Sequence, residues 1–137
     1  MNGRLGNSSM ILLDTCALLW LVADQEKLSV TARECIASYE GMIYVSAIAA
    51  FEIAIKYQKK KLVLPIKPAE WFSLALTLHG IIDLPVTSAY LAASAELPPH
   101  HQDPVDRIII ATAQANQLEI ITPDQYIKQY AGMRLIW

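Results

Sequence analysis

Short apolar runs alternate with longer helical patterns along almost the whole chain. Residues 10–13 form an apolar run that ends at Asp14, which is typical of a buried strand. Four later runs have the same character, and the segments between them read as helices. The predicted strands cover residues 10–13, 42–45, 81–84, 119–121 and 133–136, and the predicted helices cover residues 15–23, 31–38, 47–60, 70–78, 88–96, 104–116 and 123–130.

Residues with capping chemistry support the starts of three of these helices. Ser29 and Ser46 precede predicted helices, and each can accept a hydrogen bond from a backbone N–H of the first turn. Asp103 can do the same for the helix that begins at Pro104. Proline suits that first position because its missing N–H would have no partner there.

The alternation of strands and helices predicts the fold class. It is typical of an α/β domain, an α/β/α sandwich whose mostly parallel central sheet is covered by helices on both faces. We find no internal repeat, low-complexity tract or linker, so residues 10–137 are expected to form a single domain. Residues 1–9 are small, polar and unpatterned, and we expect them to be a disordered lead-in, with Met10 a candidate for the natural start.

The amino-acid composition further narrows the kind of protein. The 137 residues are 54% hydrophobic and 18% charged, which fits strands buried on both faces and an oligomer interface. The formal net charge is -2, so any attraction to phosphate must be local or carried by a metal ion. No apolar run reaches the ~20 residues of a membrane-spanning helix. Neither a disulfide framework nor a signal peptide is recognisable, so Cys16 and Cys35 are expected to be reduced thiols in the cytoplasm.

Acidic residues are placed to meet at one edge of the predicted sheet. Asp14 directly follows the first strand, and Asp124 lies just past a later one. Functional groups collect outside the carboxyl ends of parallel strands, so these two carboxylates are expected to lie close together. Glu52 belongs to the helix that begins after the second strand and shares a face with Ile48 and Ile55.

The fourth acidic residue, Asp106, lies in the first turn of its helix, on the same face as Ile109 and Ile110. An ionised side chain on a core-facing stripe costs several kcal/mol, by order of magnitude, unless it is paired or bound to a metal. Like charges gathered in one pocket require a cation, and oxygen ligands suit Mg²⁺ or Mn²⁺. Carboxylates that hold such ions are used to hydrolyse phosphodiester bonds.

Each acidic residue also has a structural interpretation. Asp14 could serve only as a helix N-cap, and Asp124 could be a turn residue after Pro123. Asp106 could close a capping box with Asp103, which itself is better explained as a cap than as a ligand. Glu52 is the hardest to explain structurally because its neighbours are apolar. The structural interpretations do not account for all four residues pointing to one edge.

The acidic residues and the segments around them, taken in chain order, resemble the PIN-domain ribonucleases, and within them the VapC-like toxins of toxin–antitoxin pairs. No single short motif is strong, but the ordered set with its spacing is specific, and the resemblance covers residues 10–137. The matching segments are residues 12–20, 45–56, 97–111, 121–124 and 135–137.

The resemblance implies the role of each acidic residue. Asp14, Glu52 and Asp106 match the acidic triad of the fold, and Asp124 matches a more variable fourth acid. It further implies a metal-dependent endoribonuclease that forms homodimers and is neutralised by a cognate antitoxin protein.

The resemblance also identifies residues that would support the acidic site, and positions at which this sequence differs from many relatives. Thr15 and Thr122 match positions where a hydroxyl supports the site, and Asp103 is expected beside it. Two positions depart from many relatives: Cys16 stands where they have His, and Val105 where they have Phe. Neither position is an acidic ligand, so the metal-site prediction stands.

Several basic residues lie near the predicted site in the sequence. Lys56 and Arg107 are each close in sequence to an acidic ligand and are candidates for binding the RNA backbone. The adjacent His100 and His101 lack the usual spacing of zinc ligands, and a surface loop is the favoured interpretation. Residues 59–61 are three lysines, which suit the solvated C-terminus of a helix.

Two alternative functions remain. A phosphatase with an Asp nucleophile after the first strand usually has a second acid two residues later, where this chain has Cys16. A non-catalytic module that binds nucleic acid or protein on the same fold would be favoured by loss of one core acid, and none is lost.

Overall fold

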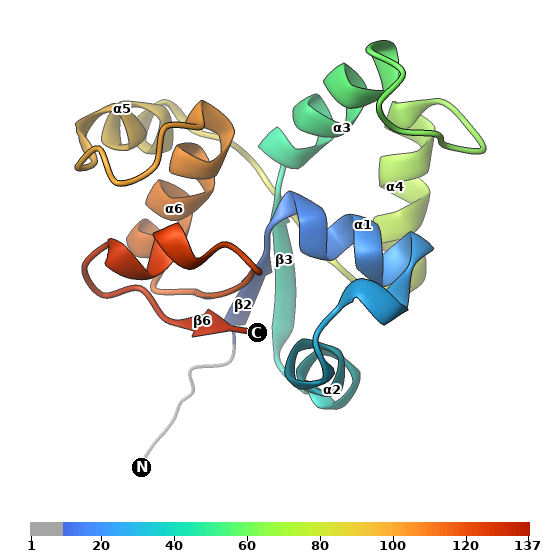
Figure 1. The fold of residues 1–137 in the computed structure, drawn as a ribbon, viewed down its shortest axis with the longest axis horizontal. Coiled ribbons are helices and arrows are strands. Elements are labelled where there is room, and N and C mark those ends of the chain that lie inside the picture. Colours follow the sequence, from blue (N-terminus) through green and yellow to red (C-terminus); the bar gives the residue numbers. More distant parts are fainter. Residues whose placement is uncertain (1–9) are drawn as a thin grey trace.

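Five parallel strands form the centre of the computed structural model, which describes residues 10–137 (Figure 1). The strand order is β4-β3-β2-β5-β6, and every neighbouring pair is parallel. The prediction of a parallel sheet is thereby confirmed, whereas the predicted disorder of residues 1–9 lies outside the described residues. The strands are β2 (Met10–Leu13), β3 (Met42–Ser46), β4 (Ile82–Leu84), β5 (Glu119–Ile121) and β6 (Leu135–Ile136).

Helices cover both faces of this sheet. In Figure 1, α5 and α6 lie on one side of β2 and β3, and α1, α2 and α4 lie on the other. The predicted α/β/α sandwich is confirmed. The helices are α1 (Thr15–Ala23), η1 (Gln25–Lys27), α2 (Val30–Ser38), α3 (Ile48–Gln58), α4 (Pro68–His79), α5 (Ser88–Glu96), α6 (Pro104–Asn116) and η2 (Gln125–Gln129).

The central strand β2 divides the hydrophobic core into two clusters. Successive side chains of a strand point to opposite faces. Ile11 and Leu13 therefore pack with the residues of α1, α3 and α4, and Leu12 packs with those of α6 and η2. All three side chains are fully buried. Burial on both faces explains why this strand is a continuous apolar run rather than an alternating one.

Several element boundaries differ from the sequence-based prediction, most clearly those of α4, η2 and β6. Helix α4 begins at Pro68 rather than at residue 70, because proline is favoured in the first turn, and it ends where Gly80 adopts φ 64°. The predicted helix over residues 123–130 is the shorter 3₁₀ helix η2. Strand β6 contains only Leu135 and Ile136 of the four predicted residues.

The helices are short relative to a membrane. Helix α6 has 13 residues, and no helix within residues 10–137 is long and apolar enough to cross a membrane. Cys16 and Cys35 are both free thiols.

Candidate active site

The fold brings the four predicted acidic residues to the carboxyl edge of the sheet. Asp14 follows β2, and its backbone N–H donates to the carbonyl of Ile121 at the end of β5 (3.2 Å). Glu52 lies in α3, which begins directly beyond β3, and Asp106 lies in the first turn of α6. Asp124 follows β5 and caps η2. All four positions therefore depend on where a strand ends or a helix begins.

Asp14 is both a helix cap and the most deeply buried of these carboxylates. One oxygen accepts a hydrogen bond from the backbone N–H of Ala17 (2.8 Å), so Asp14 is the N-cap of α1. The other oxygen accepts a hydrogen bond from the hydroxyl of Thr122. Only 5% of Asp14 is exposed. Asp14 therefore does cap α1, but the cap uses only one of its two oxygens.

Burial makes Asp14 a weaker acid than an ordinary aspartic acid. Its pKa is raised from 3.8 to about 6, chiefly because burial disfavours the charged form. Hydrogen bonds from Thr122 and Ala17 oppose this rise in pKa, since they stabilise the carboxylate. The negative charges of Glu52 and Asp124 add to the rise. Ionised Asp14 is therefore unfavourable in the absence of a cation.

Two threonines, Thr15 and Thr122, lie beside Asp14. The fully buried Thr122 donates its hydroxyl hydrogen to Asp14 and accepts the backbone N–H of Asp124 (3.0 Å). It therefore links two of the acidic residues through a single oxygen. The hydroxyl of Thr15 is also buried, and within residues 10–137 it has no hydrogen-bond partner.

Glu52 supplies a test of whether the site suits a cation. Its Oε2 lies 3.6 Å from Nζ of Lys56, which is one helical turn away. Its Oε1 is buried and has no hydrogen-bond partner within the described part of the chain. A buried carboxylate oxygen without a partner is costly. A metal ion at this position would remove that cost, so the residues present fit a divalent cation.

Asp106 is held differently from the prediction of a capping box. Asp103 caps α6, since its Oδ1 accepts the backbone N–H groups of Val105 (2.9 Å) and Asp106 (3.4 Å). The reciprocal bond is absent from this turn, because the backbone N–H of Asp103 donates to Nδ1 of His101 (3.2 Å) instead. The Asp106 carboxylate is thus left free to face the site.

The pKa of Asp106 is raised from 3.8 to about 7. Burial is the main cause, and the negative charge of Asp103 adds to it. The nearby His101 acts in the opposite direction and lowers the pKa. The charges of Glu52 and Asp14 raise it further, so the carboxylates affect one another across the site.

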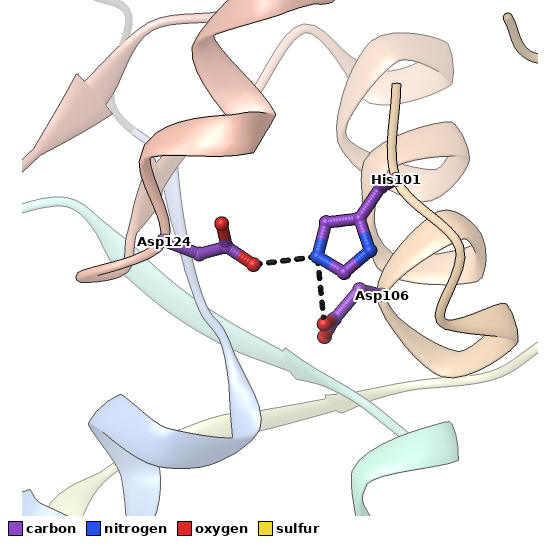
Figure 2. A group of neighbouring side chains, drawn as sticks. All are labelled: His101, Asp106 and Asp124. Carbon is purple, nitrogen blue, oxygen red and sulfur yellow. Dashed lines mark hydrogen bonds and ion pairs between the residues drawn. The ribbon is translucent and has the colours of Figure 1, made fainter. Parts of the chain in front are cut away.

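His101 also belongs to the site, although its spacing in the sequence favoured a surface loop. Figure 2 shows its ring between two carboxylates, with Nε2 2.5 Å from Oδ2 of Asp124 and 3.1 Å from Oδ2 of Asp106. Within residues 10–137, these three side chains are the group whose potential ligand atoms lie within 4.8 Å of one another. The neighbouring His100 is exposed, as expected.

Arg107 holds the loop that carries His101. Its guanidinium donates to four carbonyl groups at 2.7–3.0 Å and contacts the hydroxyl of Tyr130 at 3.5 Å. Arg107 was expected to bind the RNA backbone; in this structure its donors are directed into the protein, where they hold the loop. The four acceptors are the carbonyls of Ser94, Leu97, Pro98 and His101.

The hydroxyl of Tyr130 and the guanidinium of Arg107 together clamp the loop that carries His101. The Tyr130 contacts lead to a prediction about stability. It accepts the backbone N–H of His101 (2.9 Å) and donates to the carbonyl of Pro98 (2.8 Å), and Tyr130 is only 3% exposed. Tyr130→Phe keeps the ring but leaves the backbone N–H of His101 without its acceptor, and the Pro98 carbonyl then keeps only the hydrogen bond from Arg107. This loss should lower the free energy of unfolding by about 1–3 kcal/mol. Urea denaturation measures this change. Tyr126→Phe is the control, because Tyr126 is 61% exposed; equal effects of the two substitutions would contradict the clamp.

The fold and site define a class of protein: an α/β sandwich that gathers carboxylates at the carboxyl edge of a parallel sheet. The pattern of the PIN domain family matches residues 11–133. The chain belongs to the PIN domain family, and the family predicted from the sequence is confirmed.

Individual relatives agree with this assignment. The chain is 28% identical over 125 residues to Ribonuclease VapC22 of Mycobacterium tuberculosis, covering 90% of this chain and 94% of the relative. This similarity supports the VapC-like part of the predicted resemblance.

Solved structures show the same fold. DNA-bound VapBC from Salmonella typhimurium contains a chain with a TM-score of 0.67 and 15% identity, covering 93% of this chain and 97% of that one. A toxin–antitoxin complex from Klebsiella pneumoniae contains one with a TM-score of 0.62 and 21% identity, covering 90% and 94%. At these identities the likeness establishes the fold.

Proposed function

We propose that this protein is a metal-dependent endoribonuclease that hydrolyses RNA phosphodiester bonds and is the toxin of a toxin–antitoxin pair. The observation that carries the proposal is the group of carboxylates at the sheet edge. There Glu52 Oε1 is buried without a partner among residues 10–137, and the pKa of Asp14 is raised to about 6. Such a group of ionised carboxylates destabilises the fold when it has no cation, and a bound cation stabilises it. Similarity to Ribonuclease VapC22 supports RNA as the substrate.

The donor set suits a hard divalent cation. Carboxylate oxygens are preferred by Mg²⁺ and Mn²⁺, and we propose one of these ions as the cofactor. When bound, it would activate water and neutralise charge that develops on the scissile phosphate. The proposed ligands are Asp14, Glu52, Asp106 and Asp124.

The protein's own side chains prepare this site. Thr122 and the N–H of Ala17 fix both oxygens of Asp14, so that carboxylate has little freedom to reorient. Thr15 is proposed to support the site with its buried hydroxyl, which has no partner in the described part of the chain. Lys56 lies beside Glu52, and with 37% of its side chain exposed it is the proposed contact for the RNA backbone.

A protein partner and a second copy of the chain complete the proposal. The toxin–antitoxin complex from Klebsiella pneumoniae supports a cognate antitoxin here. An antitoxin that offers an Arg side chain could bridge two carboxylates and block the metal in the same step. Phe51 and Ile55 expose 57% and 39% of their surface on α3, which supports a docking role for that helix. We further propose a homodimer that acts in the cytoplasm.

Two assays test the proposed function. Purified protein is incubated with a mixed RNA pool in Mg²⁺, Mn²⁺ or EDTA, and cleavage is expected with the metals and not with EDTA. In cells, expression of the chain alone should arrest growth, and co-expression of the neighbouring gene should restore it.

Matched variants distinguish the site from the rest of the surface. Glu52→Gln should abolish both effects, whereas Glu26→Gln, at an exposed position in η1, should leave them unchanged. Cleavage that persists in EDTA would contradict metal dependence. Cleavage without growth arrest would leave a ribonuclease and contradict the toxin role.

A further inference from the structure

The hydrogen bonds around His101 determine which ring nitrogen carries the proton. The backbone N–H of Asp103 donates to Nδ1 at 3.2 Å. Nδ1 must therefore present its lone pair, because a proton there would face the hydrogen of another donor. The proton of the neutral ring is thus on Nε2. Nε2 is the nitrogen that lies between Asp124 and Asp106 (Figure 2).

This arrangement suits a hydrogen-bond donor rather than a metal ligand. A histidine that binds a metal through Nε2 needs its lone pair there, and its Nδ1–H then donates to a carbonyl, a carboxylate or water. In this structure the group facing Nδ1 is itself a donor, the N–H of Asp103. The Nε2–H is therefore aimed at Oδ2 of Asp124 (2.5 Å) and Oδ2 of Asp106 (3.1 Å).

The protein holds the His101 ring in this position from several sides. The hydroxyl of Tyr130 accepts the backbone N–H of His101, and Arg107 donates to its carbonyl at 3.0 Å. The ring packs edge-on against Tyr126 with a centroid distance of 6.0 Å. Only 12% of the His101 side chain is exposed. An exposed histidine on a surface loop would not be fixed by so many contacts, and we therefore infer that the position of the ring has a function.

We propose that His101 is a positioning residue that holds Asp106 and Asp124 together by donating from Nε2, and that it orients both carboxylates for a cation without binding the cation itself. This inference rests on the proposed metal-dependent function and assigns a role to a residue outside the four acidic ligands. Partners that orient metal-binding side chains typically contribute about 10–100-fold to metal affinity or activity.

Calorimetric titration of the full chain with Mn²⁺ tests this role through matched substitutions. His101→Ala should weaken Mn²⁺ binding about tenfold or more. In His101→Gln the amide nitrogen is the same number of bonds from the backbone as Nε2, so binding should recover to within about threefold of wild type. In His101→Asn the amide reaches only the position of Nδ1, so binding should stay as weak as in His101→Ala. His100→Gln, at the exposed neighbour, should bind Mn²⁺ like the wild type.

The electron-spin-echo spectrum of bound Mn²⁺ provides an independent test. No directly coordinated ¹⁴N is expected in the wild type, and a coordinated ¹⁴N that disappears in His101→Ala would overturn the proposal. Equal Mn²⁺ affinity of the Gln and Asn variants would overturn it as well. A wild type that binds Mn²⁺ with this pattern but cuts no RNA would overturn the proposed function and leave the role of His101 intact. A wild type that binds no Mn²⁺ would overturn both.

Discussion

Replacement of Asp14 by Asn is expected to stabilise the metal-free protein and to abolish its cleavage of RNA. The pKa of Asp14 is raised from 3.8 to about 6, mainly because its carboxylate is buried. At pH 8 the metal-free protein therefore bears the cost of an ionised buried group, which is about 3 kcal/mol for a pKa difference of this size. Asn carries no charge and still accepts the N–H of Ala17, which caps α1.

The expected gain in stability is smaller than the full cost of ionisation. Asn offers only one oxygen, so the hydrogen bond from Thr122 is lost or rearranged, and a lost hydrogen bond costs about 1 kcal/mol. The net increase in the free energy of unfolding should be about 1–3 kcal/mol. Urea denaturation at pH 8 in EDTA measures it.

The loss of activity should be much larger than the change in stability. A catalytic metal stabilises the transition state by several kcal/mol. A loss of about 4 kcal/mol corresponds to about a thousandfold in rate. Cleavage of RNA by Asp14→Asn in saturating Mn²⁺ should therefore fall about a thousandfold or more.

Asp83→Asn is the matched control, because Asp83 is exposed in β4 and the substitution is chemically the same. It should change neither stability nor cleavage appreciably. If Asp14→Asn were destabilised in EDTA, its role would be structural capping rather than metal binding. Full activity of Asp14→Asn would remove Asp14 from the proposed site.

The fold could be predicted from the sequence because its signals are local. The run that forms β2 is apolar at every position, and a central strand buried on both faces requires that pattern. Helix starts were marked by side chains that reach only a few residues along the chain, such as Ser29, whose hydroxyl accepts the N–H of Ala32. The less accurate boundaries, at η2 and β6, belong to short elements that depend on contacts with the rest of the protein.

The candidate site was only partly predictable for the same reason. Asp14 directly follows β2 and Asp124 lies shortly beyond the end of β5, so their common edge could be inferred from the parallel topology. The role of His101 depends on Tyr130, which is 29 residues away in the sequence. Spacing around the two histidines carries no sign of that contact. The contacts of Arg107 with the loop were not predictable either, because the carbonyls that it binds meet only when α5, the loop and α6 pack together.

The raised pKa values of Asp14 and Asp106 also predict how stability depends on pH. A group whose pKa is higher in the folded protein stabilises the fold while it is protonated, and this contribution is lost as the pH rises through the folded value. Here that loss begins above the ordinary value of 3.8 and proceeds through about 6 for Asp14 and about 7 for Asp106. A bound cation would reverse the preference, because it stabilises the ionised carboxylates.

In EDTA, the free energy of unfolding should therefore fall between about pH 4 and pH 8, with Asp14 alone contributing about 3 kcal/mol. In millimolar Mn²⁺ the fall should be smaller, since binding to the ionised site adds stability by mass action. The increase in melting temperature caused by Mn²⁺ should accordingly grow from pH 5 to pH 8. Urea denaturation and thermal melts across this range measure both effects, and Asp14→Asn should flatten the EDTA profile. Stability in EDTA that stays constant across this range, or an Mn²⁺ effect that is the same at pH 5 and pH 8, would show that these carboxylates are not the groups that bind the metal.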